Sequence, residues 1–332
     1  MISQISKVDF RVKFLKEIPL IQVPPRLSVL EAVAFKQNFK QLCQGSPLPN
    51  QIIIDFSQTT FMDSSGLGAL VSNLKTAQQQ GINLVLRQVQ PQVMAVFSLT
   101  GLDGVFTIEQ AHEPVTPTVN RRSEWKPPVT HPSVRSWVKR AIDVLGALVG
   151  LGITAILFIP IAVAIKLDSQ GPIFFGQIRC GWMGRQFRIW KFRSMCTNAE
   201  ALKSTVQNQV SGAIFKNDKD PRVTKLGRFL RRTSLDELPQ FWNVLIGEMS
   251  LVGTRPPTPD EVESYEVPEW QRLDVKPGMT GEWQVSGRSQ LRSFEDVIRL
   301  DLKYQQNWSL IYDIKLILKT IAVVFRKNSG AV

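Results

Sequence analysis

The feature that most constrains this chain is an uncharged apolar stretch of 22 residues, 144-VLGALVGLGITAILFIPIAVAI-165. A helix of about 20 such residues is long enough to cross the hydrocarbon core of a bilayer. Basic residues flank both ends, Lys139 and Arg140 before and Lys166 after, so the positive-inside rule gives no preferred orientation. Pro160 lies in the second half of the stretch, where proline interrupts helical hydrogen bonding. We therefore expect a re-entrant membrane segment that kinks at Pro160 and returns to the face it entered. A straight span is the first alternative, and a buried core helix is a weaker one because every face is apolar.

The 332 residues suggest about two domains, and composition places the boundary. Residues 113–136 are rich in Pro, Thr, Ser and Arg and read as a linker between a domain at 1–112 and a domain at 137–332. The net charge of +12 is uneven. Residues 1–112 hold 9 Lys and Arg against 7 Asp and Glu, whereas the rest holds 31 against 21. The second part is thus suited to a polyanionic partner: nucleic acid, an anionic membrane face or a phosphorylated substrate.

Histidine and cysteine usage excludes several kinds of site. The two histidines, His112 and His131, nearly exclude a Ser-His-Asp hydrolase and a His-ligated metal site. The three cysteines are odd in number and have no CxxC spacing, which argues against a disulfide framework and fits a reducing cytoplasm. No secretory signal peptide is expected at the start of the chain.

Residues 1–112 alternate strand and helix patterns. The expected strands lie within 12–23 and at 52–57, 82–88 and 105–108, and the expected helices lie at 28–43, from about 64 to Gly81, and from Pro91 to about 99. Such alternation predicts a small α/β domain with a mostly parallel sheet.

The segment FMDSSGLGAL, between an apolar strand and a helix, carries a resemblance. Together with GINLVL, a Pro-led helix and GLDGVFTI, it resembles the STAS, or anti-sigma-factor-antagonist, family over nearly all of residues 1–112. The resemblance implies a regulatory binding module in which Ser64 is the phosphorylation site. A phosphate there would meet the free N–H groups of a helix N-terminus, yet would add close to two negative charges to a docking face. The alternative is that Asp63 and Ser64 only cap the helix.

The stretch 221–257 joins a basic amphipathic segment to two acids. Four basic residues alternate with apolar ones in KLGRFLRR, a pattern typical of segments that lie on anionic lipid headgroups. Asp236 and Glu237 follow, just before Pro239. A carboxylate beside arginines can hold Mg²⁺ and attack a phosphoryl group, although two acids at a helix start are by themselves more often structural.

From Lys139 to about Val324 the chain resembles the bacterial sugar transferases, the monotopic polyprenyl-phosphate phosphoglycosyl transferases. The motifs that carry the resemblance are KRAID (139–143), the apolar hairpin, GPIFFGQIRCGWMGR (171–185), KFRSM (191–195), DPRVTKLGRFLRRTSLDELPQFWNVLIGEMSLVGTRP (220–256), KPGMTGEWQVSGR (276–288) and Tyr304, Trp308, Ser309 and Asp313. The fold it implies is a helix-rich α/β membrane-associated catalytic domain with a re-entrant hairpin.

The resemblance implies roles for individual residues. Asp236 would be the nucleophile that attacks the β-phosphate of a UDP-sugar, and Glu237 would help to position the metal or the acceptor. Mg²⁺, held by both acids, would be the cofactor. Arg231 and Arg255 would bind phosphate oxygens. Lys191 and Arg193 would either face the site too or lie against lipid headgroups.

The reaction implied is transfer of a hexose-1-phosphate from a UDP-sugar to polyprenyl (undecaprenyl) phosphate through a covalent phosphosugar-aspartate, with release of UMP. It would start an exopolysaccharide or another glycoconjugate at the cytoplasmic face of the inner membrane. The alternative is a membrane-anchored scaffold with an inactive transferase half, in which the STAS-like module binds a kinase or an anti-sigma-like partner. Nucleic-acid binding is the weakest hypothesis, because the positive charge alternates with apolar residues beside a hairpin.

Overall fold

The computed structural model describes residues 10, 12–109, 130–202, 205–209, 217, 220–286 and 294–325. It divides into two compact units. The first contains Met1–Thr130 together with Glu266–Asp274, and the second contains His131–Tyr265 and Val275–Val332. Residues 266–274 thus belong to the N-terminal unit, although they lie in the C-terminal half of the sequence. Most of the predicted linker at 113–136 lies outside the described residues.

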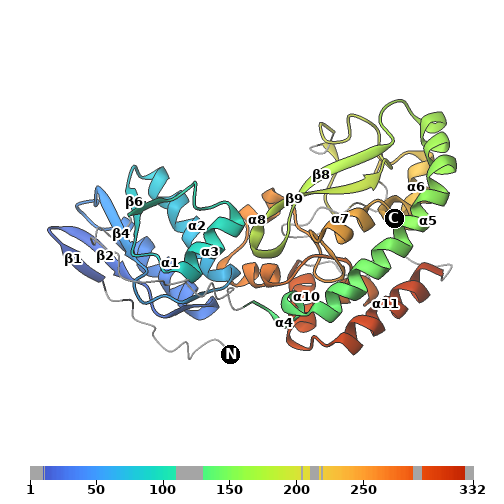
Figure 1. Cartoon of the computed structure of the whole chain (residues 1–332). Coiled ribbons are helices and arrows are strands. Elements are labelled where there is room, and N and C mark those ends of the chain that lie inside the picture. The colour runs from blue at the N-terminus through green and yellow to red at the C-terminus, as the bar shows by residue number, and fades with distance from the viewer. Residues whose placement is uncertain are drawn as a thin grey trace, which may run out of the picture. The chain divides into compact units, whose positions relative to one another are not determined.

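The first unit is built on a five-stranded sheet with the order β1-β2-β4-β6-β7 (Figure 1). Its strands are β1 (Val12–Leu15), β2 (Ile18–Gln22), β4 (Gln51–Asp55), β6 (Asn83–Arg87) and β7 (Thr107–Glu109). The pair β1–β2 is antiparallel and the other three pairs are parallel. The central strands are buried because their sequences are continuous apolar runs, as in Ile52, Ile53 and Ile54. The predicted α/β class is confirmed.

Three helices complete this unit: α1 (Val29–Cys43), α2 (Ser64–Gln79) and α3 (Pro91–Thr100). The side chain of Asp63 accepts a hydrogen bond from the N–H of Gly66 and so caps α2. Gly101 ends α3 in the left-handed conformation that a helix C-terminus favours. A two-residue parallel pair, β3 (Arg26–Leu27) with β5 (Phe61–Met62), was not expected from the sequence.

The apolar stretch lies in one helix of the second unit, α5 (Trp137–Asp168), which follows the short helix α4 (Pro132–Arg135). By length and composition it is the one helix of the described residues that is able to cross a membrane, and only 22% of its most apolar window is buried. The helix continues through Pro160, and Figure 1 shows that its axis changes direction in its second half. The segment is therefore a bent helix and not two helices joined by a loop. Its re-entrant placement stays a prediction.

The rest of the second unit is an antiparallel hairpin, a short parallel pair and several helices. The hairpin consists of β8 (Phe174–Cys180), the turn η1 (Trp182–Gly184) and β9 (Gln186–Phe192), and the parallel pair is β10 (Ser250–Val252) with β11 (Gly278–Thr280). The helical elements are α6 (Lys225–Arg232), η3 (Leu235–Glu237), α7 (Gln240–Ile246), α8 (Pro259–Glu263), α9 (Glu282–Val285), α10 (Phe294–Gln306) and α11 (Leu310–Phe325). The turn η4 (Val267–Asp274) belongs to the first unit.

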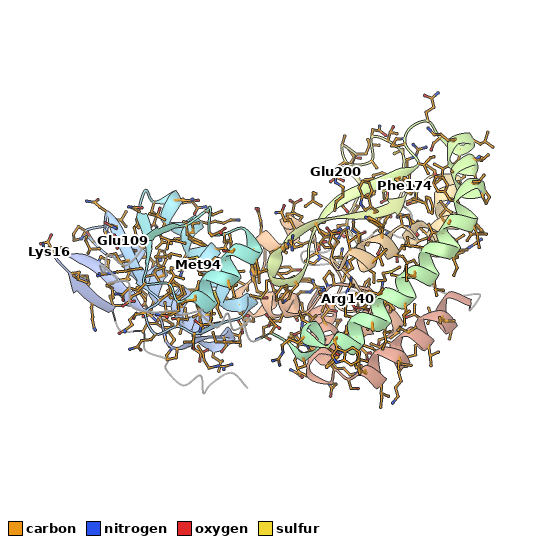
Figure 2. All side chains as sticks on the ribbon, viewed as in Figure 1. Lys16, Met94, Glu109, Arg140, Phe174 and Glu200 are labelled. Carbon is orange, nitrogen blue, oxygen red and sulfur yellow. The ribbon has the colours of Figure 1, made fainter. Side chains whose placement is uncertain are left out.

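Helix α5 is held to α7 by close packing and by an arginine. A β-carbon at Gly150 would overlap the ring of Phe241, so glycine permits the close approach of the two helices. Arg140, labelled in Figure 2, donates to the carbonyl oxygens of Val244 and Leu245 at 2.7 and 2.6 Å. These bonds add a charged donor to carbonyls in the last turn of α7. The buried amide of Asn243 then joins α7 to β9 by accepting from Trp190 N–H at 3.2 Å.

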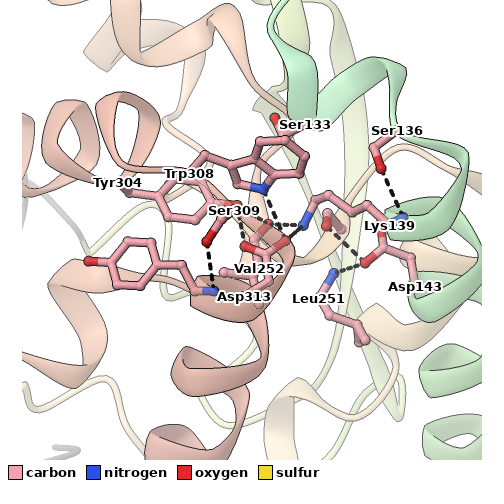
Figure 3. A network of polar contacts seen from close by, with 12 residues as sticks. Ser133, Ser136, Lys139, Asp143, Leu251, Val252, Tyr304, Trp308, Ser309 and Asp313 are labelled. Carbon is pink, nitrogen blue, oxygen red and sulfur yellow. Dashed lines mark hydrogen bonds and ion pairs between the residues drawn. The ribbon is translucent and has the colours of Figure 1, made fainter.

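A buried polar network connects the first turns of α5 with α10, α11 and the end of β10 (Figure 3). Lys139 Nζ lies 2.6 Å from Asp313 Oδ2 and donates to the carbonyl of Val252 at 3.0 Å. The same aspartate accepts from the hydroxyl of Tyr304 and from the indole N–H of Trp308. The KRAID segment and the C-terminal motif are therefore two parts of one structural network.

Candidate functional site

The two neighbouring acids lie on η3, a single turn between α6 and α7. Ser234, which precedes the turn, has a left-handed backbone with φ of 55°, and Pro239 leads into α7. Asp236 is buried, with 5% of its surface exposed. A short turn fixed by a helix at each end gives the Asp236 carboxylate a defined position.

Glu237 forms an ion pair that links this turn to the hairpin. Its Oε1 lies 2.9 Å from Nζ of Lys191 on β9, and the two side chains are 17% and 27% exposed. The structure thus brings together two residues that the sequence analysis selected from separate motifs, LDELP and KFRSM.

Arg231 lies on α6, close to the segment that follows β9. Its Nε donates to Ser194 Oγ at 3.0 Å. The helix reaches Ser194 through Gly227, where a β-carbon would overlap the Ser194 carbonyl oxygen, and Thr224 N–H donates to the same oxygen at 3.1 Å. The start of α6 and Arg231 therefore both contact Ser194, two residues beyond β9.

Arg255 is held by a carboxylate of α8. Its two terminal nitrogens contact the two oxygens of Glu261 at 2.7 and 3.0 Å, a bidentate pair. Burial alone would raise the pKa of Glu261, but the charges of Arg255 and Arg179 outweigh it and lower that pKa. The Arg255 fork is thus oriented by a carboxylate, the same geometry in which an arginine binds a phosphate.

Arg179 on β8 is a further member of this region that the sequence analysis did not select. It donates to the carbonyl of Pro256 at 3.0 Å and to Gln177 Oε1 at 2.6 Å, and its buried Nε has no hydrogen-bond partner. Burial, and then the charge of Arg255, lower its pKa to about 10. The guanidinium stays charged at neutral pH and has one donor available for an anion.

The hairpin register places Arg179 on the same face as Lys191. Directly opposed residues of an antiparallel pair share a face, and the structure pairs Phe175 with Lys191 and Arg179 with Phe187. Phe175 and Arg179 are four residues apart and so also share a face. The alternation in FFGQIRC was the signal available in the sequence, but a lone arginine in a strand does not show what it faces.

Comparison with known proteins identifies the family. The bacterial sugar transferase family matches residues 134–327, which is more than half of the chain. The chain belongs to the bacterial sugar transferase family. The STAS domain family matches residues 9–118, so a STAS domain precedes the region that the sugar transferase family matches. Both resemblances expected from the sequence are confirmed.

Similar proteins include several transferases. Galactosyl transferase CpsE of Streptococcus agalactiae serotype III (strain NEM316) is 51% identical over 188 residues, which cover 56% of this chain and 42% of CpsE. Exopolysaccharide production protein ExoY of Rhizobium meliloti (strain 1021) is 41% identical over 192 residues, which cover 56% of this chain and 84% of ExoY. UDP-glucose:undecaprenyl-phosphate glucose-1-phosphate transferase of Escherichia coli (strain K12) is 42% identical over 197 residues, 57% of this chain and 40% of that protein. The chain thus spans well under half of the length of CpsE and of the Escherichia coli transferase.

Among solved structures, the crystal structure of a putative anti-sigma factor antagonist from Thermotoga maritima is 27% identical. The match covers 31% of this chain and 87% of that one, with a TM-score of 0.28.

Three further residues that the sequence analysis selected lie elsewhere in the chain. Arg193 is buried and donates through Nη2 to the carbonyl of Ser169 at 2.6 Å and to its hydroxyl at 3.0 Å, where α5 ends. Pro160 lies inside α5. Ser64 belongs to the other compact unit, at the first residue of α2.

The acids of the transferase suit a magnesium ion. Mg²⁺ is commonly held by one or two carboxylates, with water and substrate phosphates as the remaining ligands. Asp236 and Glu237 offer such a pair at one turn. Within the part of the chain that the structure describes, no group of three or more His, Cys, Asp and Glu side chains is placed to hold a metal by itself. The donor set therefore fits a metal that is completed by the substrate.

Proposed function

We propose that this protein transfers a sugar-1-phosphate, that of a hexose, from a UDP-sugar to undecaprenyl phosphate and so starts an exopolysaccharide or a related glycoconjugate. The observation that carries the proposal is the turn with Asp236 and Glu237, because its ion pair to Lys191 joins two family motifs in one site. The names of relatives such as the Escherichia coli glucose-1-phosphate transferase support the donor and acceptor classes.

In the first step, a carboxylate oxygen of Asp236 attacks the β-phosphorus of the UDP-sugar. An oxygen–phosphorus bond forms, and the bond from that phosphorus to the bridging oxygen of UMP breaks, with UMP taking the electron pair. The product is a phosphosugar-aspartate. The burial of Asp236 supports this role, since water that would hydrolyse the acyl phosphate is kept from it.

In the second step, a phosphate oxygen of undecaprenyl phosphate attacks the same phosphorus. The aspartate leaves as a carboxylate, and undecaprenyl-diphosphate sugar is formed. Cationic side chains that hold phosphate oxygens lower the barrier of both steps by stabilising the developing charge. Arg231, Arg255 and Lys191 are our candidates for this work, with Arg179 added by its unpartnered Nε.

Asp236 and Glu237 would hold Mg²⁺, which offsets the charge of the diphosphate when it is bound. Lys191 would keep the Glu237 carboxylate oriented in both the loaded and the empty enzyme.

We also place the reaction at the cytoplasmic face of the inner membrane, where a nucleotide sugar from the cytoplasm meets a lipid phosphate. The support is apolar surface on the transferase unit. Several large apolar side chains of α5 are more than half exposed, Ile156 and Ile159 at 79% and 70%. Phe229 of α6 and Trp242 of α7 are nearly half exposed, and Phe174 of β8, labelled in Figure 2, is 41% exposed. Such a surface is rare on a soluble protein and typical of membrane contact.

The test is UMP release by detergent-purified full-length protein with undecaprenyl phosphate, Mg²⁺ and a panel of UDP-sugars. Asp236→Asn is compared with Asp260→Asn, which removes an exposed carboxylate of α8 in the same unit. We expect release that needs Mg²⁺, disappears in Asp236→Asn and persists in Asp260→Asn. With radiolabelled sugar donor and no acceptor, the label should stay on the wild-type protein alone. Release that survives in Asp236→Asn would contradict the proposed nucleophile, and silence with every donor would favour a scaffold.

A further inference from the structure

The STAS domain of this chain already has a bound segment, and the segment comes from the transferase half. Residues 266–274, which include η4, pack against α1 and α2 within the first compact unit. Val267, Arg272 and Leu273 are each at most 3% exposed. Both ends of this segment continue directly into the second unit, at Tyr265 and Val275.

An aromatic side chain anchors the segment on α2. A β-carbon at Gly68 would overlap the indole ring of Trp270, so the glycine of the SSGLG motif makes room for the ring. At the other end, Lys36 of α1 and Glu266 form an exposed ion pair at 3.0 Å. A surface pair contributes little, so the buried apolar contacts carry most of the docking energy.

Asp274 ends the segment at the first residue of α2. Its Oδ1 accepts a hydrogen bond from the N–H of Ser64 at 2.8 Å, one of the donors that a helix start leaves without a helical partner. Asp63 accepts from Gly66 N–H at 3.0 Å in the same turn. Two carboxylates thus already lie at this helix end, and Ser64 is fully buried beneath them.

The local electrostatics agree with this crowding. Burial, and then the charge of Asp63, raise the pKa of Asp274 to about 7. The site therefore accommodates Asp274 most easily when that carboxylate is protonated, and any further negative charge would have to displace one of the acids.

We propose that residues 266–274 are a built-in ligand of the STAS domain, and that their docking and a negative charge on Ser64 exclude each other. The modification that supplies the charge is phosphorylation: a serine kinase transfers the γ-phosphoryl group of a nucleoside triphosphate to Ser64 Oγ, with loss of the hydroxyl proton and release of the nucleoside diphosphate. Because Ser64 is buried in the docked state, the kinase acts only after the segment has left. The phosphate then keeps the segment off by repelling Asp274 and by filling its place.

The chain that follows the segment connects it directly to the transferase unit. β11 begins at Gly278, four residues after Asp274, and Gly278 N–H donates to the carbonyl of Thr254 at 2.9 Å. Thr254 precedes Arg255. The segment therefore leads into the strand that supports an arginine of the proposed site, and docking couples the two halves of the chain. This consequence for activity rests on the proposed function, whereas the docking itself does not.

The test is hydrogen–deuterium exchange of the full-length protein in detergent, with Ser64→Glu compared with Ser64→Gln. The two side chains have nearly equal volume, so their difference reports the charge. We expect amides of 267–274 to exchange at least tenfold faster in Ser64→Glu than in Ser64→Gln, while amides of β4 and β6 stay equally protected. Adding Asp274→Asn to Ser64→Glu should recover part of the protection. Equal exchange in the Glu and Gln variants would overturn the proposal.

A second measurement serves if both Ser64 variants unfold. Ser64→Cys, made together with Cys196→Ser, is a small change, and Cys43 and Cys180 are buried. We expect the thiol at position 64 to react slowly with a maleimide, and at least tenfold faster when Trp270→Ala is added to loosen the segment. A rate that Trp270→Ala leaves unchanged would show that the segment does not cover position 64. Both readouts are independent of sugar transfer, so their failure is distinct from failure of the proposed function.

Discussion

Lys139, in the first turn of α5, and Asp313, in the first turn of α11, form a buried ion pair with 2.6 Å between Nζ and Oδ2 (Figure 3). The two residues are 174 positions apart in sequence, yet the pair is 5–7% exposed, and Val252, Tyr304 and Trp308 make further hydrogen bonds to it. A buried pair with these further hydrogen bonds fixes the position of α5 relative to α11.

We expect Lys139→Met to lower the free energy of unfolding of the transferase unit by about 3–5 kcal/mol, because it leaves the Asp313 carboxylate buried without its cation. Thermal unfolding in detergent measures the loss. Arg299→Gln is the matched control, since Arg299 pairs with Asp296 at the surface and a surface pair contributes about 0–1 kcal/mol. The double variant Lys139→Met/Asp313→Leu should be more stable than Lys139→Met. If it is less stable, the uncompensated charge is not the cause.

Arg193 is expected to stabilise the C-terminal end of α5. Its Nη2 bonds to Ser169 satisfy groups at the helix C-terminus. Hydrogen bonds of charged donors contribute about 1.5–3 kcal/mol, so Arg193→Gln should lower the free energy of unfolding by that amount. Thermal unfolding and the KM for the UDP-sugar are measured on the same preparation. A raised KM at an unchanged unfolding temperature would instead place Arg193 at the substrate.

Arg179 is expected to bind the diphosphate of the donor. Loss of one charge-assisted hydrogen bond should raise the KM for the UDP-sugar about 10- to 100-fold in Arg179→Gln. Arg179→Lys should recover little, because an ammonium lacks the planar fork that contacts Gln177 and Pro256. Steady-state UMP release gives both constants. Arg185→Gln, an exposed arginine just before β9, is the control and should leave the KM unchanged. A KM that Arg179→Gln does not change would remove Arg179 from the site.

The sequence predicted the elements of the STAS domain well, because continuous apolar runs and helix-end residues such as Asp63 and Gly81 are local signals. It missed the β3–β5 pair, since two residues carry no periodicity. The kink expected at Pro160 lies within α5, which remains one helix, and the re-entrant placement stays a prediction. Around the bend, Phe158 stacks on Phe174 of β8, and this tertiary contact supports the helix where Pro160 removes a hydrogen bond.

The site was predicted only as far as local motifs reach. Asp236, Glu237 and Lys191 were selected from short motifs, and the structure joins two of them in an ion pair. Arg255 pairs with Glu261 of α8, and α8 packs against β8, the strand that carries Arg179. The contact of Trp270 with Gly68 joins positions about 200 residues apart, and no spacing in the sequence indicates it.

The docking of residues 266–274 is expected to be tighter in acid than in base. The pKa of Asp274 is raised from 3.8 to about 7 when the segment is docked, so the docked state binds more protons than the released state between these values. Its stability therefore falls as pH rises from about 4 to 7 and is lowest above 7. Asp63, whose pKa is also raised, by burial and to a lesser extent by the charge of Glu31, acts in the same direction.

The measurement is hydrogen–deuterium exchange of amides 267–274 at pH 5 and pH 8, each divided by the intrinsic exchange rate at that pH. We expect weaker protection at pH 8 in the wild type. In Asp274→Asn, which cannot ionise, the difference between the two pH values should shrink to the part contributed by Asp63. An undiminished difference in Asp274→Asn would assign the pH dependence to other groups.

The bend of α5 is expected to return the chain to the membrane face that it entered. Pro160 has no N–H to donate to the carbonyl of Ile156, and its ring crowds that carbonyl, so the helix bends there. Trp137 and Leu167 lie near the two ends and are 79% and 83% exposed, which makes them suitable for cysteine labelling. The background is Cys196→Ser, in which the remaining Cys43 and Cys180 are buried. In inside-out membrane vesicles, an impermeant maleimide should react with both Trp137→Cys and Leu167→Cys, and in intact spheroplasts with neither.

Pro160→Leu restores the donor and should straighten α5. The straight helix would move Leu167→Cys into the bilayer or to the outer face and abolish its labelling in inside-out vesicles. Ile159→Leu, a neighbouring change that leaves the backbone donors intact, should not alter the labelling. Reaction of Leu167→Cys in spheroplasts of the otherwise unchanged chain would show that α5 spans the membrane.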